Sequence, residues 1–280
     1  MAFNLNNFVI DRVVKAVAFD TSDDTKILFS INQVTNPSLN VTSETAEAVD
    51  ALGTPVAIFN RAKSCEFSAE NALFDMGLMA VQAGGEVASA TANNTITVPA
   101  FETIAIADYQ ASAYSLKKTP TKDDEGNVIV KAYAVRNDGT IVSDVLTPGA
   151  EAAVDTYVLD TANTPVKLVP PTTLSTADAS QIMIVYQYEA DGTEKNGAVS
   201  VINSAQNFPK ACKLVVEVLG CDICDQTDLI YAYLIFPNFK LSSDFDWGMS
   251  TDSTHPFSGR AMQSYCEADK KLYQIIIPEA

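Results

Sequence analysis

Alternating apolar and polar residues predict β-strands along most of the chain. In residues 26–34 the side chains of Ile27, Phe29 and Ile31 point the same way, which is the period of a half-buried strand. Similar runs, rich in β-branched and aromatic residues, are bounded by clusters of Gly, Asn, Asp and Pro. They cover residues 13–19, 56–67, 95–98, 109–116, 128–135, 140–145, 156–159, 182–188, 198–202, 212–220, 229–236, 239–247 and 271–278. The pattern predicts a mainly β fold, a sandwich or a barrel.

One segment has the period of a helix. Residues 69–83 repeat apolar side chains at helical spacing, at Leu73, Phe74, Leu78, Met79 and Val81. Ser68 or Asn71 can cap its start, and Gly84-Gly85 can end it. We therefore expect one packed α-helix over residues 69–83.

Two stretches of the chain depart from the main pattern. Residues 38–50 are rich in Ser, Thr and Glu and hold few large apolar residues, so we expect an exposed loop or arm, and its length favours a functional role. Residues 120–202 carry short strands with frequent turns, which predicts a small β module inserted in the main fold. The predicted domains are residues 1–119 and 203–280 for the main fold and 120–202 for the insert.

The chain is acidic and carries little recognisable chemistry. Its 280 residues are 47% hydrophobic, and 35 acidic against 18 basic residues give a net charge of −17. A protein this acidic has no basic surface with which to hold nucleic acid, so the charge serves solubility or, in a ring, an acidic bore that repels phosphates.

The N-terminus shows no secretory signal, and no apolar run is long enough to span a bilayer, which indicates a soluble protein made in a cytoplasm.

Catalytic and metal-binding motifs are missing from the sequence. The single histidine, His255, lies in a turn-like stretch, and there is no nucleophile elbow, phosphate loop or dinucleotide fingerprint. Cys221 and Cys224 form a CxxC pair that could begin a zinc site, but no second close pair completes it. Buried structural thiols are favoured over zinc. We expect no enzyme activity, no cofactor and no bound metal.

A late segment alternates acidic and apolar residues. Asp244 and Asp246 alternate with Phe245 and Trp247, which predicts a strand with one wet, acidic face and one packed face.

Two regions resemble phage tail tube proteins. One is Val34-Thr35-Asn36-Pro37 with the polar arm and residues 51–83, and the other is residues 231–259, with a strand, a Phe-Pro turn, a second strand and a late Pro-Phe-Ser-Gly. The resemblance implies a β-sandwich or barrel with one packed helix, six copies in a ring, and rings stacked into a tube. The insert would then decorate the outside.

The same resemblance assigns roles to particular residues. The arm would reach the adjacent ring through Ser38, Val41, Glu44, Glu47 and Asp50. Asp244 and Asp246 would line an acidic bore or a solvated strand face. The partners it implies are further copies of the chain, sheath, tape-measure and tail-terminator proteins, and DNA that passes without specific binding. The protein would be assembled in the host cytoplasm and reside in the virion tail.

Two other functions stay open at this point. A capsid decoration protein would share the β modules and the lack of catalytic motifs. An adhesive or carbohydrate-binding module would need an aromatic platform, which Trp247, Tyr231 and Tyr233 could supply, although core positions in strands are the commoner role for such residues. The sequence leaves open whether the tail contracts and which strands face the bore.

Overall fold

The structure, a computed structural model, describes residues 8–109, 112–176, 178–263 and 270–278. The chain divides into two compact units, residues 1–87 with 201–280 and residues 88–200. We call them the sheet unit and the inserted unit. The boundary predicted at 119/120 lies instead at 87/88, because β6 (Ile96–Ala105) pairs along its whole length with β13 (Ala179–Ala190) and so belongs to the insert.

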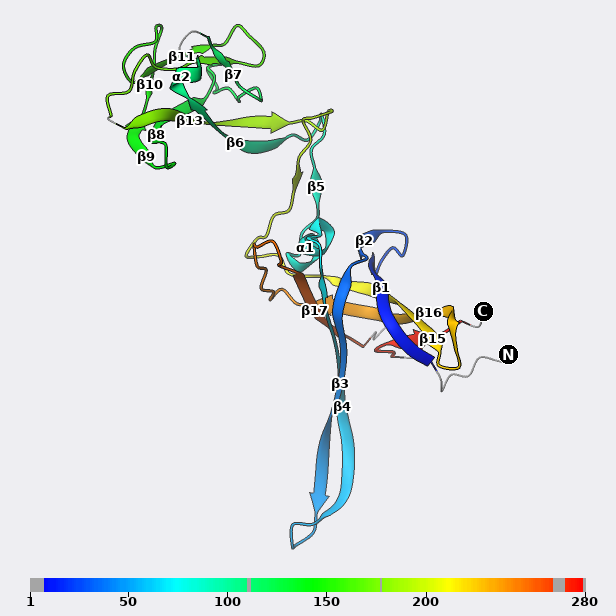
Figure 1. The fold of residues 1–280 in the computed structure, drawn as a ribbon. Helices are drawn as coiled ribbons and strands as arrows, with labels where there is room; N and C mark the ends of the chain where they lie inside the picture. The colour runs from blue at the N-terminus through cyan, green and yellow to red at the C-terminus, as the bar shows by residue number, and fades with distance from the viewer. Residues whose placement is uncertain (1–7, 110–111, 177, 264–269, 279–280) are drawn as a thin grey trace. The chain divides into compact units, whose positions relative to one another are not determined.

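Eight strands within the described residues of the sheet unit form one sheet (Figure 1). Their order is β2-β1-β15-β16-β17-β4-β3, with β18 beside β16. The strands are β1 (Phe8–Asp20), β2 (Ile27–Ile31), β3 (Val34–Val49), β4 (Pro55–Asn71), β15 (Ala211–Asp222), β16 (Asp225–Leu241), β17 (His255–Ala261) and β18 (Gln274–Ile276). Strand β1 contacts β3 although four strands lie between them in the sheet order, so the sheet curls into an incomplete barrel.

One face of the curled sheet forms the core of the sheet unit. Strand β15 alternates buried and half-buried residues as its sequence predicts, with Leu214 and Val216 fully buried. The ring of Phe67 packs against the rings of Phe236 and Phe257, at centroid distances of 5.7 and 6.1 Å. Aromatic pairs at these distances combine a large buried apolar area with favourable ring geometry.

The helix is shorter than predicted. Helix α1 spans Met76–Gln82, and Asp75 caps it by accepting a hydrogen bond from the Leu78 amide at 2.7 Å. Residues 69–71 belong to β4, because their backbone pairs with β17 and that pairing outweighs their helical preference. Gly84 ends the helix at a φ of +70°, where an added Cβ would meet the backbone of Phe208 at 2.5 Å.

The inserted unit is a β-sandwich. Two four-stranded sheets, β6-β13-β8-β9 and β10-β11-β12-β7, enclose a core that includes Tyr157, Leu168 and Ile184. The unit also holds a one-turn helix and a two-stranded sheet of β5 with β14. Its further elements are β5 (Ala88–Ser89), α2 (Ile106–Tyr109), β7 (Tyr114–Ser115), β8 (Val130–Arg136), β9 (Ile141–Val145), β10 (Thr147–Pro148), β11 (Thr156–Asp160), β12 (Lys167–Val169) and β14 (Val199–Ser200). The prediction of a mainly β fold is confirmed.

A buried carboxylate on β6 links this strand to β7 and β13 of the inserted unit through hydrogen bonds. Glu102 on β6 accepts hydrogen bonds from the hydroxyls of Tyr114 and Tyr186 and from the Lys117 amide, the last at 3.0 Å. Burial and the neighbouring carboxylate raise the pKa of both tyrosines, so both hydroxyls keep their protons and donate.

Candidate assembly surfaces

Strands β3 and β4 continue beyond the core as a two-stranded ribbon (Figure 1). Between residues 42 and 63 both of its faces are open to solvent, with only Ala46 and Ala57 half-buried. The strands stay paired from Thr42↔Ser64 to Val49↔Pro55. A hairpin without a packing partner is marginally stable in water. The ribbon is therefore a surface that a partner would stabilise.

The turn of this ribbon is well defined. Asp50 accepts hydrogen bonds from the amides of Leu52 and Thr54, both at 2.9 Å, and Gly53 takes a φ of +82°. Such a side-chain-capped turn with glycine at the left-handed position fixes the register of the two strands.

Large apolar side chains are exposed around the turn. We call this group the tip: Val49, Leu52, Val56, Ile58 and Phe59, with exposed fractions of 56% to 90%. Exposed apolar clusters of this kind are typical of interaction sites. The sequence predicted the strand over residues 56–67 but no exposed role for it, because an apolar run alone does not show whether its strand is covered.

The predicted arm residues all lie on the outgoing side of the ribbon. Ser38, Val41, Glu44 and Glu47 are exposed on β3, and Asp50 holds the turn. Of the predicted exposed loop or arm, the exposure is confirmed and the loop is wrong, since residues 38–49 form a strand. Pairing with β4 satisfies the backbone groups that face it and solvent reaches the others, so a polar segment forms a strand without any core of its own.

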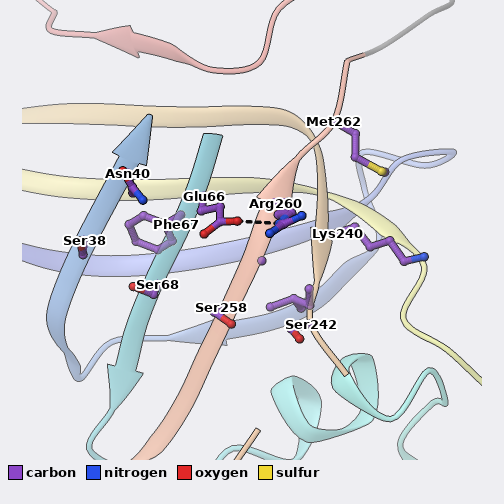
Figure 2. A pocket seen from close by; sticks show the side chains of 12 residues that line it. Ser38, Asn40, Glu66, Phe67, Ser68, Lys240, Ser242, Ser258, Arg260 and Met262 are labelled. Carbon is purple, nitrogen blue, oxygen red and sulfur yellow. Dashed lines mark ion pairs between the residues drawn. The ribbon is translucent and has the colours of Figure 1, made fainter. Parts of the chain in front are cut away.

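A polar hollow of about 620 Å³ lies at the base of the ribbon (Figure 2). Two cross-strand rows line it. One row is Ser38, Ser68 and Ser258, and the other is Asn40, Glu66, Arg260 and Lys240. Arg260 and Glu66 form an ion pair at 2.6 Å, and both are substantially exposed, so it contributes at most about 1 kcal/mol. The hollow offers hydroxyls and mixed charges to solvent.

The two predicted bore residues lie on no strand. Strand β16 ends at Leu241, and residues 242–254 are irregular, so the predicted strand over 239–247 is wrong beyond Leu241. Asp244 borders a smaller hollow of about 180 Å³ together with Ser68, Glu70 and Ser258. Asp244 and Asp246 are exposed, as their alternation with apolar residues predicts.

The irregular segment is held by aromatic stacking around the histidine. Phe74 stacks on Trp247 at 4.5 Å and on His255 at 5.4 Å. His255 was predicted in a turn-like stretch, but it begins β17 and is 1% exposed, because the Phe74 and Trp247 rings cover it. Its Nε2 lies 2.9 Å from Gln82 Oε1, and its Nδ1 accepts from the Asp75 amide at 3.5 Å. These partners make it a structural residue.

An apolar groove of about 430 Å³ runs along the inside of the curled sheet near the ribbon's base. The lining is apolar except for the hydroxyls of Ser38 and Tyr233. Its residues come from β1, β3, β4, β15, β16 and the C-terminal segment, among them Phe8, Ile10, Leu39, Val218, Ile275 and Ile277. Ile10 and Ile275 are 65% and 58% exposed, so the groove is open to solvent. Nothing in the described part of the chain fills it.

The cysteines give no metal site within the described residues. Cys65 and Cys212 are buried in the sheet unit, and burial raises the pKa of Cys212 to about 12. Cys221 lies on β15, Cys224 lies in the turn between β15 and β16, and Cys266 lies outside the described residues.

A comparison with protein-family models agrees with the resemblance seen in the sequence. Across the helices that the structure describes, none has the length and apolar character needed to span a membrane. No curated protein matches the chain. A sequence model of the YomU/Tube protein family matches residues 8–276, which include both the sheet unit and the inserted unit. The chain therefore belongs to the YomU/Tube protein family, a family of phage tail tube proteins.

Proposed function

We propose that copies of this chain form rings, with six copies to a ring as the family resemblance implies, and that the rings stack into a phage tail tube. The observation that carries the proposal is the ribbon of β3 and β4, which leaves the core with both faces exposed and an apolar tip. A lone monomer gains nothing from such an element, whereas neighbouring copies can cover it. The predicted arm residues lie on this ribbon.

Open sheet edges supply a second route for association. Strand β2 is the last strand at one end of the sheet and pairs with β1 alone, and Ile27 on it is 56% exposed. An unpaired edge is a template for another chain, and closing a ring of identical copies removes that liability. We assign ring closure to pairing at this edge.

The tube would serve as a conduit for DNA. Each chain carries a net charge of −17, so a wall built from many copies would repel phosphate groups. Exposed carboxylates such as Asp244 and Asp246 would do so in the bore. The wall itself carries out no reaction. Sheath, tape-measure and tail-terminator proteins are the further partners, in a virion tail assembled in the host cytoplasm.

Negative-stain microscopy of the concentrated protein tests this function. The expected result is six-fold rings and tubes. Ile27→Lys places a charge on the open edge and should reduce the fraction of closed rings at least tenfold, whereas Leu73→Lys, at a residue that is 60% exposed and lies on no strand, should leave it unchanged. A protein that stays monomeric at high concentration would overturn the proposal, and trimers would favour a capsid decoration protein.

A further inference from the structure

A lysine and an asparagine from distant parts of the inserted unit lie in contact. Lys118 lies in the connection between β7 and β8, and Asn196 lies in the loop between β13 and β14. Lys118 Nζ is 3.4 Å from Asn196 Oδ1, although 78 residues separate the two in the chain. Both residues are half-buried. The fold therefore brings an amine, which is a nucleophile when neutral, to the carbonyl group of an amide.

The amine of Lys118 is held at this position. Its Nζ also donates to the carbonyl oxygen of Lys195 and lies 5.3 Å from the centre of the Tyr188 ring. The backbone amide of Lys118 donates to the Tyr186 hydroxyl at 3.1 Å, so the base of the side chain is fixed as well. A free lysine side chain samples many rotamers, and these contacts confine it beside Asn196.

The amide of Asn196 is oriented with its oxygen toward the lysine. Its Nδ2 donates to Asp191 Oδ1 at 2.9 Å and to the Glu189 carbonyl at 3.0 Å. A carboxylate and a carbonyl accept hydrogen bonds and cannot donate, so the nitrogen faces them and Oδ1 faces Lys118. Asp191 is itself held by the amide and the hydroxyl of Thr193, at 3.0 and 2.6 Å.

We propose that Lys118 and Asn196 become joined by an amide bond within the folded inserted unit. Asn196 Cγ is one C=O bond of about 1.2 Å from Oδ1, so it lies at most about 4.6 Å from Lys118 Nζ. Well-oriented intramolecular reactions reach effective concentrations of about 10⁵ M or more, which makes an otherwise very slow aminolysis of an amide feasible.

The reaction balances without an oxidant or a cofactor. The Lys118 ammonium group loses one proton to water, and the lone pair of the neutral amine forms a bond to Asn196 Cγ. A second amine proton passes to Nδ2, beside which Asp191 Oδ1 lies. The bond between Cγ and Nδ2 then breaks and ammonia leaves. The product is a secondary amide that joins Lys118 Nζ to Asn196 Cγ.

The bond closes a loop that contains much of the inserted unit. Residues 118–196 include every strand from β8 to β13. A covalent bond that closes so long a loop restricts the unfolded chain, as a disulfide does. Unlike a disulfide, an amide bond forms and persists in a reducing compartment. The bond therefore stabilises the inserted unit against unfolding, and it does so in a single copy, independently of assembly.

Intact-mass spectrometry of the full-length protein tests the bond. After prolonged incubation at pH 9, where more of a lysine amine is neutral, we expect a mass about 17 Da below that of the sequence, the mass of ammonia. Trypsin should release residues 118–122 joined to residues 196–210. Lys118→Arg should keep the full mass, because a guanidinium group stays protonated. Lys117→Arg, at the exposed neighbouring lysine, is the control and should lose ammonia as the unmodified chain does.

A second control excludes a competing reaction of the same asparagine. The backbone amide of Gly197 can also displace ammonia from Asn196, which gives a succinimide with the same loss of mass. An added Cβ at Gly197 meets no atom within 4 Å, so Gly197→Ala slows this reaction without disturbing the loop. We expect Gly197→Ala to lose ammonia and to yield the joined peptides. A full mass in the unmodified chain, or a loss of ammonia confined to residues 196–210, would overturn the inference and leave the proposed function standing.

Discussion

At the scale of single residues, His255 is placed to make stability depend on pH. Burial lowers the pKa of His255, against the opposing effect of Asp75, so the folded chain holds the imidazole neutral. The unfolded chain binds the proton at the ordinary pKa of 6.5. The stabilising effect is therefore complete above pH 6.5 and is lost as the pH falls from there toward the folded pKa.

Replacing His255 by Gln separates this pH effect from packing. We expect His255→Gln to lower the free energy of unfolding of the sheet unit by about 1–3 kcal/mol at pH 7, because the smaller side chain leaves space under Phe74. The loss of stability of the unmodified chain between pH 6.5 and 5 should be weaker in the variant. Urea unfolding followed by tryptophan fluorescence measures both, since Trp247 lies beside the histidine. Equal pH slopes in the two proteins would refute the titration of His255 as the cause.

In the inserted unit, we expect the buried Glu102 to contribute to stability as His255 does in the sheet unit. Glu102→Gln turns one acceptor oxygen into an NH₂ group that faces a hydroxyl donor, Tyr114 or Tyr186, and we expect it to destabilise this unit by about 1–3 kcal/mol. Glu189→Gln on β13 is the control, because Glu189 is exposed and bonds only exposed hydroxyls. Hydrogen exchange of the amides in β13 measures the effect. Protection that is unchanged in the Glu102 variant would contradict the stabilising role of this carboxylate.

At the scale of elements, the local pattern predicted the buried strands and missed the exposed half of β3. Strand β15 buries alternate side chains, so its period appears in the sequence. The ribbon half of β3 buries no side chain, so a polar composition looked like a loop. The start of the predicted helix, residues 69–71, is drawn into β4 by pairing with β17, a segment nearly 190 residues away in the chain. The groove could not be predicted because five strands and the C-terminal segment meet to form it.

The ribbon can be shortened without changing which of the remaining side chains lie on each of its two faces. Two neighbouring rows, Glu44↔Arg61 and Thr45↔Asn60, can be deleted together, which keeps the side-chain alternation of both strands. The reach then falls by two residues, about 7 Å. We expect tubes whose axial repeat is shorter by about that amount in averaged micrographs.

Deleting one row is the control for this prediction. Removing only Thr45 and Asn60 turns the tip's side chains to the opposite faces of the ribbon, and we expect stacking to be lost while single rings remain. An axial repeat that is unchanged by the two-row deletion would show that the ribbon does not set the distance between rings.

At the scale of the whole molecule, the candidate assembly surfaces all lie in one unit. The ribbon, the groove, the open edge at β2 and the polar hollow all belong to the sheet unit. The inserted unit has its own core and its own hydrogen-bond network. Such a division is what a module added to a complete fold would show.

The ends of the inserted unit make its removal practical. Ala88 pairs with Ser200 and Ser89 with Val199, so the chain enters and leaves the unit on neighbouring antiparallel strands about 5 Å apart. Deleting residues 88–200 and joining Val87 to Val201 through a short Gly-Ser linker should leave the curled sheet folded, as circular dichroism and urea unfolding would report. If the insert decorates the outside, the shortened chain still forms rings and tubes, and their outer diameter falls while the bore and the axial repeat stay the same. Folded chains that no longer form rings would instead assign the insert to the contacts between copies.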